Sequence, residues 1–110
     1  MKFKQRESTQ FIHVDMKNLK GAGVEKLFKE ARRNGELDTG YHIILSNTGL
    51  CETDREKGAV AQYNFPDANC SLYILADTGK IDKLNDAQNA ALRQVLQDYP
   101  AAKLELRLVE

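Results

Sequence analysis

Several residue types that support particular functions are scarce in this chain of 110 residues. It has two histidines, two prolines and no tryptophan, and its two cysteines, Cys51 and Cys70, do not form a CxxC pair. We expect both cysteines to be reduced thiols of an intracellular protein. So few histidines and thiols leave little from which to build a zinc site, which needs three or four converging ligands.

Long hydrophobic runs and an excess of one charge are also missing. No apolar segment follows Met1, and none approaches the roughly 20 residues that a membrane helix needs. Sixteen basic residues balance sixteen acidic ones, whereas nucleic-acid-binding domains usually carry surplus lysine and arginine. These absences predict a cytoplasmic protein that contacts neither a membrane nor nucleic acid directly.

What is present fits one small globular domain over residues 1–110. Hydrophobic residues make up 42% of the chain and charged residues 29%, an ordinary composition for a protein that buries one core. Apolar positions at helical spacing predict a helix from Val24 to Ala31, ended by Asn34 and Gly35. A second helix begins with a capping box at Asn85 and Gln88 and ends at Pro100.

Short apolar runs between these helices predict the strands. The expected strands are 11–14, 40–45, 50–52, 70–76 and 103–108. Residues 40–45 and 50–52 form a hairpin, and 103–108 has one face exposed to solvent. The resulting fold class is α/β, with a mixed central sheet of about five strands and helices on both faces.

Candidate residues for chemistry are few. The sequence contains no GxSxG elbow and no glycine-rich phosphate loop, which excludes two common types of catalytic site. His13 lies in the first strand and His42 in the hairpin strand; for both, a buried structural histidine is the simpler interpretation. No nucleophile or paired carboxylates stand out, so the pattern favours a binding protein over an enzyme.

Three segments of the sequence resemble a known family. They are FKQREST at 3–9 followed by FIHV at 11–14, GELDTGYH at 35–42, and ETDREKGAV at 52–60. Together they are similar to the lysozyme of bacteriophage T-seven and its relatives, which are zinc-dependent N-acetylmuramoyl-L-alanine amidases. The resemblance covers nearly the whole chain and implies the amidase fold, a mixed sheet with helices on both sides.

The same resemblance implies roles for particular residues. His13 matches the first zinc ligand and Tyr41 the active-site tyrosine. A second ligand is expected near the end of the last strand, but residues 106–110 contain no histidine, and neither do residues 59–64. The family's cysteine ligand and catalytic lysine lie beyond position 110. We therefore expect no metal, no other cofactor and no amidase activity, so the chain is predicted not to be an enzyme.

Two kinds of partner remain open on this view. The family also binds a phage-type RNA polymerase and inhibits transcription, which would make the N-terminal segment with Lys2, Lys4, Arg6 and Glu7 a surface for that polymerase or a host factor in the host cytoplasm. That segment could equally be an edge strand of the fold.

The alternative is a small ligand, a muropeptide or a host immune signal, held without cleavage in the former active-site groove by His13, Tyr41 and Tyr63. A third interpretation retains enzymatic activity through another metal arrangement or a partner chain. A sheet face left bare would also favour a homo-oligomer.

Overall fold

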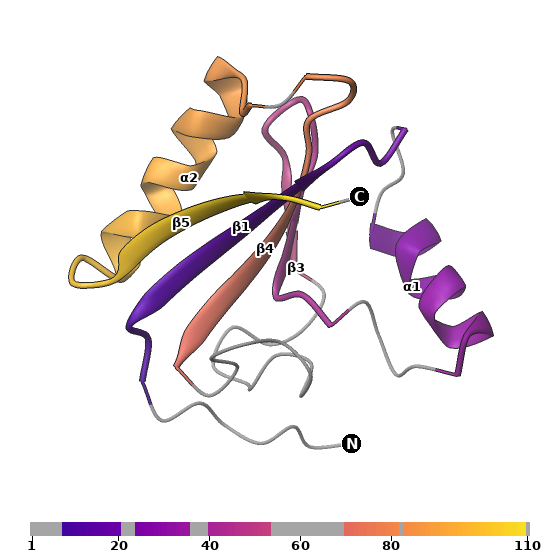
Figure 1. Ribbon diagram of the computed structural model, residues 1–110, viewed down its shortest axis with the longest axis horizontal. Helices are drawn as coiled ribbons and strands as arrows, with labels where there is room; N and C mark the ends of the chain where they lie inside the picture. The colour runs from indigo at the N-terminus through magenta and orange to yellow at the C-terminus, as the bar shows by residue number, and fades with distance from the viewer. Residues whose placement is uncertain (1–7, 21–23, 36–39, 54–69, 82, 110) are drawn as a thin grey trace.

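The computed structural model describes residues 8–20, 24–35, 40–53, 70–81 and 83–109. These residues form five strands and two helices (Figure 1). In chain order the elements are β1 (Phe11–Lys17), α1 (Val24–Arg33), β2 (Ile43–Leu45), β3 (Cys51–Thr53), β4 (Ser71–Asp77), α2 (Asp86–Asp98) and β5 (Lys103–Leu108). No helix among the described residues is both long and apolar enough to cross a membrane.

The five strands make one mixed sheet in the order β3-β2-β4-β1-β5. β4 pairs in parallel with β1 and β2, β1 pairs in parallel with β5, and β3 joins β2 in an antiparallel hairpin. β4 is buried along its whole length, as its continuous apolar run predicts for a central strand covered on both faces. β5 and β3 are the two edges.

The helices lie on opposite sides of this sheet (Figure 1). The larger core lies between α2 and the face that carries Ile12, Val14 and Ile74, where Leu92 and Val95 of the helix pack. On the other face, Leu27 of α1 and Tyr41 pack against a smaller cluster of Leu19, Ile44 and Leu75. The expected fold class is thereby confirmed, including a helix on each face. The bounds of the predicted domain, 1–110, extend beyond the described residues and stay a prediction.

Local signals account for most element boundaries. α2 begins with the capping box, since the Asn85 side chain accepts from the Gln88 backbone N–H and the Gln88 side chain accepts from that of Asn85. The hairpin turn closes with Gly49, which has a φ of +88° and would bring a Cβ to 2.8 Å from the backbone oxygen of Ala87. This position therefore requires glycine for its conformation and for its close approach to α2.

Two strand expectations are corrected. The strand expected at 40–45 is regular only over Ile43–Leu45, because Gly40 takes a positive φ of 86° that interrupts an extended strand. The last strand was expected to bury its leucine side, yet all six of its residues are exposed. β5 is an edge of the sheet. α2 packs against β1 and β4 and does not cover the side chains of Leu104, Leu106 and Leu108.

Candidate functional site

A charged cluster lies on the face of the sheet that α1 covers in part. Its centre is Asp15, which lies within β1 between Val14 and Met16 and is completely buried. Asp15 stands opposite Arg107 in the parallel register of β1 and β5, so both side chains project from the same face. The Arg107 Nε and Nη2 atoms donate to the two carboxylate oxygens of Asp15 at 3.0 and 2.9 Å.

Tyr41 completes the cluster from the opposite direction. It lies just before β2, and its hydroxyl donates to Asp15 Oδ2 at 2.6 Å. Three donors therefore converge on one buried carboxylate. Removing this carboxylate from water without such partners would cost several kcal/mol. The buried charge of Asp15 is thus compensated, and its oxygens are occupied.

Tyr41 is a fixed hydrogen-bond donor in this arrangement. Burial of its ring, followed by the hydrogen bond and the negative charge of Asp15, raises the pKa of Tyr41 well above its usual range. The hydroxyl consequently keeps its proton at neutral pH and does not act as a base there. The hydrogen bond with Asp15 also raises the pKa of Arg107, so the guanidinium stays charged.

The alkaline stability of the protein is expected to depend on Tyr41. An unfolded tyrosine loses its proton near pH 10, whereas the folded Tyr41 retains it to higher pH. The stabilisation is complete below about pH 10 and is lost as the pH rises from there towards the folded pKa, by at most about 1.4 kcal/mol per pH unit. Urea denaturation between about pH 8 and pH 11 measures this loss. The free energy of unfolding of Tyr41→Phe should lack this loss at high pH, and that of Tyr99→Phe should retain it. The same dependence of the free energy of unfolding on pH in both variants would contradict the prediction.

A row of aromatic rings continues from the cluster along the same face. His13 stacks on Tyr73 with ring centroids 4.8 Å apart and on Phe11 at 5.9 Å, and Tyr73 meets Tyr41 edge-on at 6.4 Å. The Nδ1 atom of His13 lies 3.2 Å from Glu105 Oε2. Its Nε2 atom is buried and has no hydrogen-bond partner among the described residues.

The residues expected from the sequence to have a functional role lie in different parts of the chain. His13 and Tyr41, both expected to bind a ligand, lie on the same face and are linked through Tyr73. Tyr63 and the N-terminal residues Lys2, Lys4, Arg6 and Glu7 lie outside the described residues. His42 is buried, and its Nδ1 accepts the backbone N–H of Tyr73 at 3.0 Å, which is a structural role.

The sequence interpretation missed Asp15 and Arg107. A signal was available, because an aspartate between Val14 and Met16 in an apolar strand is seldom buried without a cationic partner. The sequence could not show which of the many lysines and arginines supplies that partner, since Arg107 lies 92 positions away.

The described residues do not fit a zinc centre. Among them, no three or more histidine, cysteine, aspartate or glutamate side chains gather closely enough to hold a metal ion. Of these residue types, His13 has Glu105 beside it among the described residues, and the carboxylate of Asp15 is taken by Arg107 and Tyr41. The polar group that this cluster presents to solvent is the Arg107 guanidinium, whose side chain is 51% exposed.

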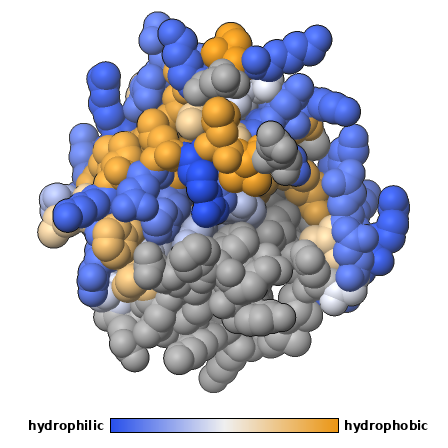
Figure 2. Space-filling model, in the orientation of Figure 1, coloured by the Kyte–Doolittle hydropathy of each residue, from blue (hydrophilic) through white to orange (hydrophobic). Residues whose placement is uncertain are grey.

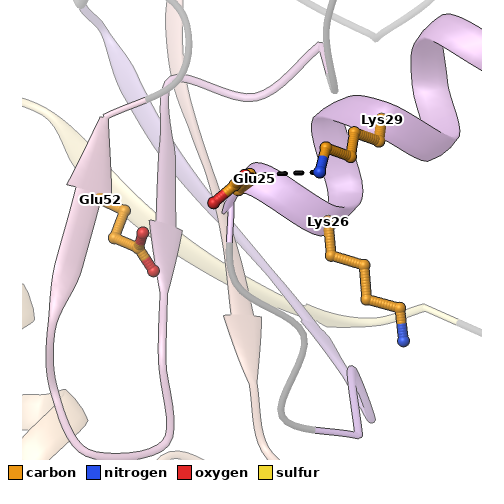
Figure 3. Close-up of a pocket in the computed structure, with 4 residues that line it drawn as sticks. All are labelled: Glu25, Lys26, Lys29 and Glu52. Atoms are coloured by element: carbon orange, nitrogen blue, oxygen red, sulfur yellow. Dashed lines mark ion pairs between the residues drawn. The ribbon is translucent and has the colours of Figure 1, made fainter.

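Two of the shallow depressions on the surface of the described residues lie away from this cluster. One is lined by Glu25, Lys26 and Lys29 of α1 together with Glu52 of β3, whose carboxylate points towards the helix (Figure 3). Glu25 and Lys29 pair at 3.4 Å with both side chains largely exposed, which contributes little stability. The other lies between the hairpin turn and α2, where Leu50 and Val95 contribute to its wall. Neither depression includes a residue of the Asp15 cluster.

Comparison with known proteins finds relatives of one kind. No family model matches the chain. The chain is 34% identical over 105 residues to the endolysin of Escherichia phage T7, covering 87% of this chain and 70% of that protein. It is 31% identical to the endolysin of Enterobacteria phage T3 over the same shares.

Solved structures share the fold at low identity. The endolysin N-acetylmuramoyl-L-alanine amidase LysCS from Clostridium intestinale superposes with a TM-score of 0.78 at 15% identity, over 96% of this chain and 73% of that one. Peptidoglycan recognition protein SD of Drosophila gives 0.73 at 15% identity, over 98% and 73%. The fold is therefore the one shared by these amidases and peptidoglycan recognition proteins.

The relatives correct one expectation from the sequence. The chain was predicted not to be an enzyme because it has few metal ligands and no evident nucleophile. Relatives that are themselves endolysins, matched over 87% of this chain, overturn that prediction. The inference had relied on scarce residue types and on family zinc ligands that residues 59–64 and 106–110 do not match, and neither observation establishes that an activity is lost.

Proposed function

Because the chain belongs to the family of the phage T7 and T3 endolysins, we propose that it acts on bacterial peptidoglycan as an N-acetylmuramoyl-L-alanine amidase. The observation that carries this proposal is the 34% identity over 87% of the chain. The fold supports it, since solved structures with the same architecture include such amidases and a peptidoglycan recognition protein. Its reaction is hydrolysis of the amide between the lactyl group of muramic acid and L-alanine.

The described residues contribute substrate binding and orientation in this proposal. The peptide stems of peptidoglycan carry carboxylates, and a guanidinium binds a carboxylate strongly when its own position is fixed. Arg107 meets that requirement, because two of its nitrogens are held by Asp15 while its side chain is half exposed. The residues that the structure describes do not form a zinc centre, and the role of Arg107 in binding the substrate does not depend on a metal.

An assay on isolated cell walls tests the proposal. Purified protein incubated with peptidoglycan sacculi should release soluble fragments and create new amino groups on L-alanine. We expect Arg107→Lys to raise the substrate concentration needed for half-maximal rate by about tenfold. Lysine keeps the positive charge but cannot make the two hydrogen bonds to Asp15 that fix the arginine side chain. Lys103→Ala, an exposed lysine on the same face of β5, should leave it unchanged.

The assay is run with added zinc and with a chelator, and the metal content of the purified protein is measured in parallel. Hydrolysis in either condition supports the proposal, and the metal content shows whether an ion is needed. No new amino groups in both conditions, from a protein with a normal unfolding transition, would refute it.

Binding to a phage-type RNA polymerase is a second proposal. It rests on the similarity of residues 3–9 to the family's N-terminal segment and involves Lys2, Lys4, Arg6 and Glu7. A pull-down with the cognate polymerase, using the full chain and a chain without residues 2–7, tests it. Equal or absent capture by the two chains would count against it.

A further inference from the structure

The outer edge of β5 carries an exposed row of leucines. Leu104, Leu106 and Leu108 project from the face that α2 covers elsewhere, and they are 40, 51 and 54% exposed. In Figure 1 no other element passes in front of β5, and Figure 2 shows hydrophobic residues in a band across this side of the molecule. Three large apolar side chains in a row on an edge strand mark a surface that can pair with another strand.

The backbone of β5 is also oriented for such pairing. The N–H groups of Lys103 and Val109 donate to β1, to the oxygens of Gln10 and Met16, both at 2.9 Å. In a strand the N–H and C=O of one residue point to the same side, and successive residues alternate. The odd-numbered residues therefore bond to β1, and the backbone groups of the three leucines face outward.

The sequence of β5 is complementary to itself in one antiparallel register. If two copies meet about a two-fold axis at Leu106, each outward-facing leucine pairs with an outward-facing leucine, and Leu104 lies opposite Leu108 of the second copy. Glu105 then lies opposite Arg107 of the second copy, twice, on the other face. Both side chains are half exposed, at 55 and 51%, so an ion pair across the seam can add to the contacts that Arg107 makes with Asp15 and Glu105 makes with His13.

Neighbouring registers lack this match. A slip by one residue would set outward-facing groups against residues already bonded to β1. Moving the two-fold axis to Glu105 puts two glutamates face to face, and moving it to Arg107 puts two arginines face to face. Like charges directly opposite are destabilising. Charge and backbone orientation thus select the register centred on Leu106.

We propose that β5 is a homodimerisation edge, where two copies of this chain pair antiparallel about Leu106 to form one continuous sheet. The two-fold axis is perpendicular to the sheet, so both Asp15 clusters lie on the same side of the dimer. Resting on the proposed function, this arrangement lets one dimer bind two positions of a repeating polymer such as peptidoglycan, with a gain in avidity.

Cysteine cross-linking tests the register directly. Residues paired across such a strand have Cα atoms about 5.5 Å apart, within the range of a disulfide. With the exposed Cys51 replaced by serine, Leu106→Cys should form a covalent dimer of twice 12.4 kDa under mild oxidation. Leu104→Cys is the matched control, since its symmetry mate lies more than about 13 Å away, and it should stay monomeric.

Sedimentation of the uncross-linked protein provides the second measurement. Leu106→Glu should raise the dimer dissociation constant by about tenfold or more, because it replaces buried apolar surface with charge at the axis. Ile81→Glu, a substitution at a similarly exposed apolar residue outside β5, should not change it. Circular dichroism establishes that both variants are folded, and neither experiment requires peptidoglycan.

The outcomes separate the possibilities. Cross-linking at position 106 alone, together with a dimer weakened by Leu106→Glu, supports the proposal. A wild-type protein that is monomeric at all concentrations overturns it. So does cross-linking at both positions or at neither, or a dimer that Leu106→Glu leaves intact, since pairing then uses another register, surface or partner. Amidase activity could survive any of these results, so the two proposals fail independently.

Discussion

Arg107→Leu is expected to lower the free energy of unfolding by about 2–4 kcal/mol. Breaking a buried ion pair by removing one partner costs about 3–5 kcal/mol, and we lower that figure because Arg107 is half exposed. The substitution leaves the buried carboxylate of Asp15 with the Tyr41 hydroxyl as its remaining side-chain donor among the described residues. Urea denaturation at neutral pH measures the loss.

Two variants show whether the cost comes from the unpaired charge. Lys103→Leu changes an exposed cation to leucine on the same face of the same strand and should alter stability by less than about 0.5 kcal/mol. Combining Arg107→Leu with Asp15→Asn should recover part of the loss, since the buried charge is then gone. If Arg107→Leu alone were as stable as Lys103→Leu, the buried charge of Asp15 would not depend on Arg107 for its stabilisation.

Gln88→Ala is expected to cost about 2–4 kcal/mol, the second large effect. The Gln88 side chain is completely buried at the start of α2. Its Nε2 donates to the backbone oxygens of Asp77 at 2.6 Å and Ser46 at 3.2 Å, and its Oε1 accepts from the Asn85 N–H. Alanine leaves these three groups without that partner, and each unsatisfied buried group costs about 1–3 kcal/mol before relaxation and water entry.

Gln94→Ala is the control for this second prediction. It is the same substitution in the same helix, at an exposed position, so helix propensity changes equally in both variants. Thermal unfolding followed by circular dichroism should show a clear loss of melting temperature for Gln88→Ala alone. Similar melting temperatures for the two variants would mean that Gln88 does not link α2 to the ends of β2 and β4.

Much of the fold could be predicted because its signals are local. The capping box at Asn85 and Gln88, the apolar run of β4 and the hairpin turn at Gly49 each depend on residues close together in the chain. Periodicity alone also predicted the pattern of β5. Periodicity did not predict that the leucines of β5 are exposed, because an alternating strand has the same sequence pattern whether it lies at the edge or in the centre of a sheet.

The candidate site was predictable only in part. Resemblance drew attention to His13 and Tyr41, and both lie on the face that carries the cluster. The hydrogen bond from Tyr41 to Asp15 joins residues 26 positions apart, and the ion pair with Arg107 joins residues 92 apart. Nothing in the local pattern of either strand specifies such a partner.

By itself, the sequence determined the type and order of the elements and the family of the chain, because periodicity, caps and the similarity of short segments to a family are properties of neighbouring residues. Only the tertiary structure decided that Asp15 is the centre of the cluster, that Arg107 supplies its counter-charge and that the leucines of β5 face solvent. These depend on strand order and register, since the parallel pairing of β1 with β5 sets which distant side chains share a face.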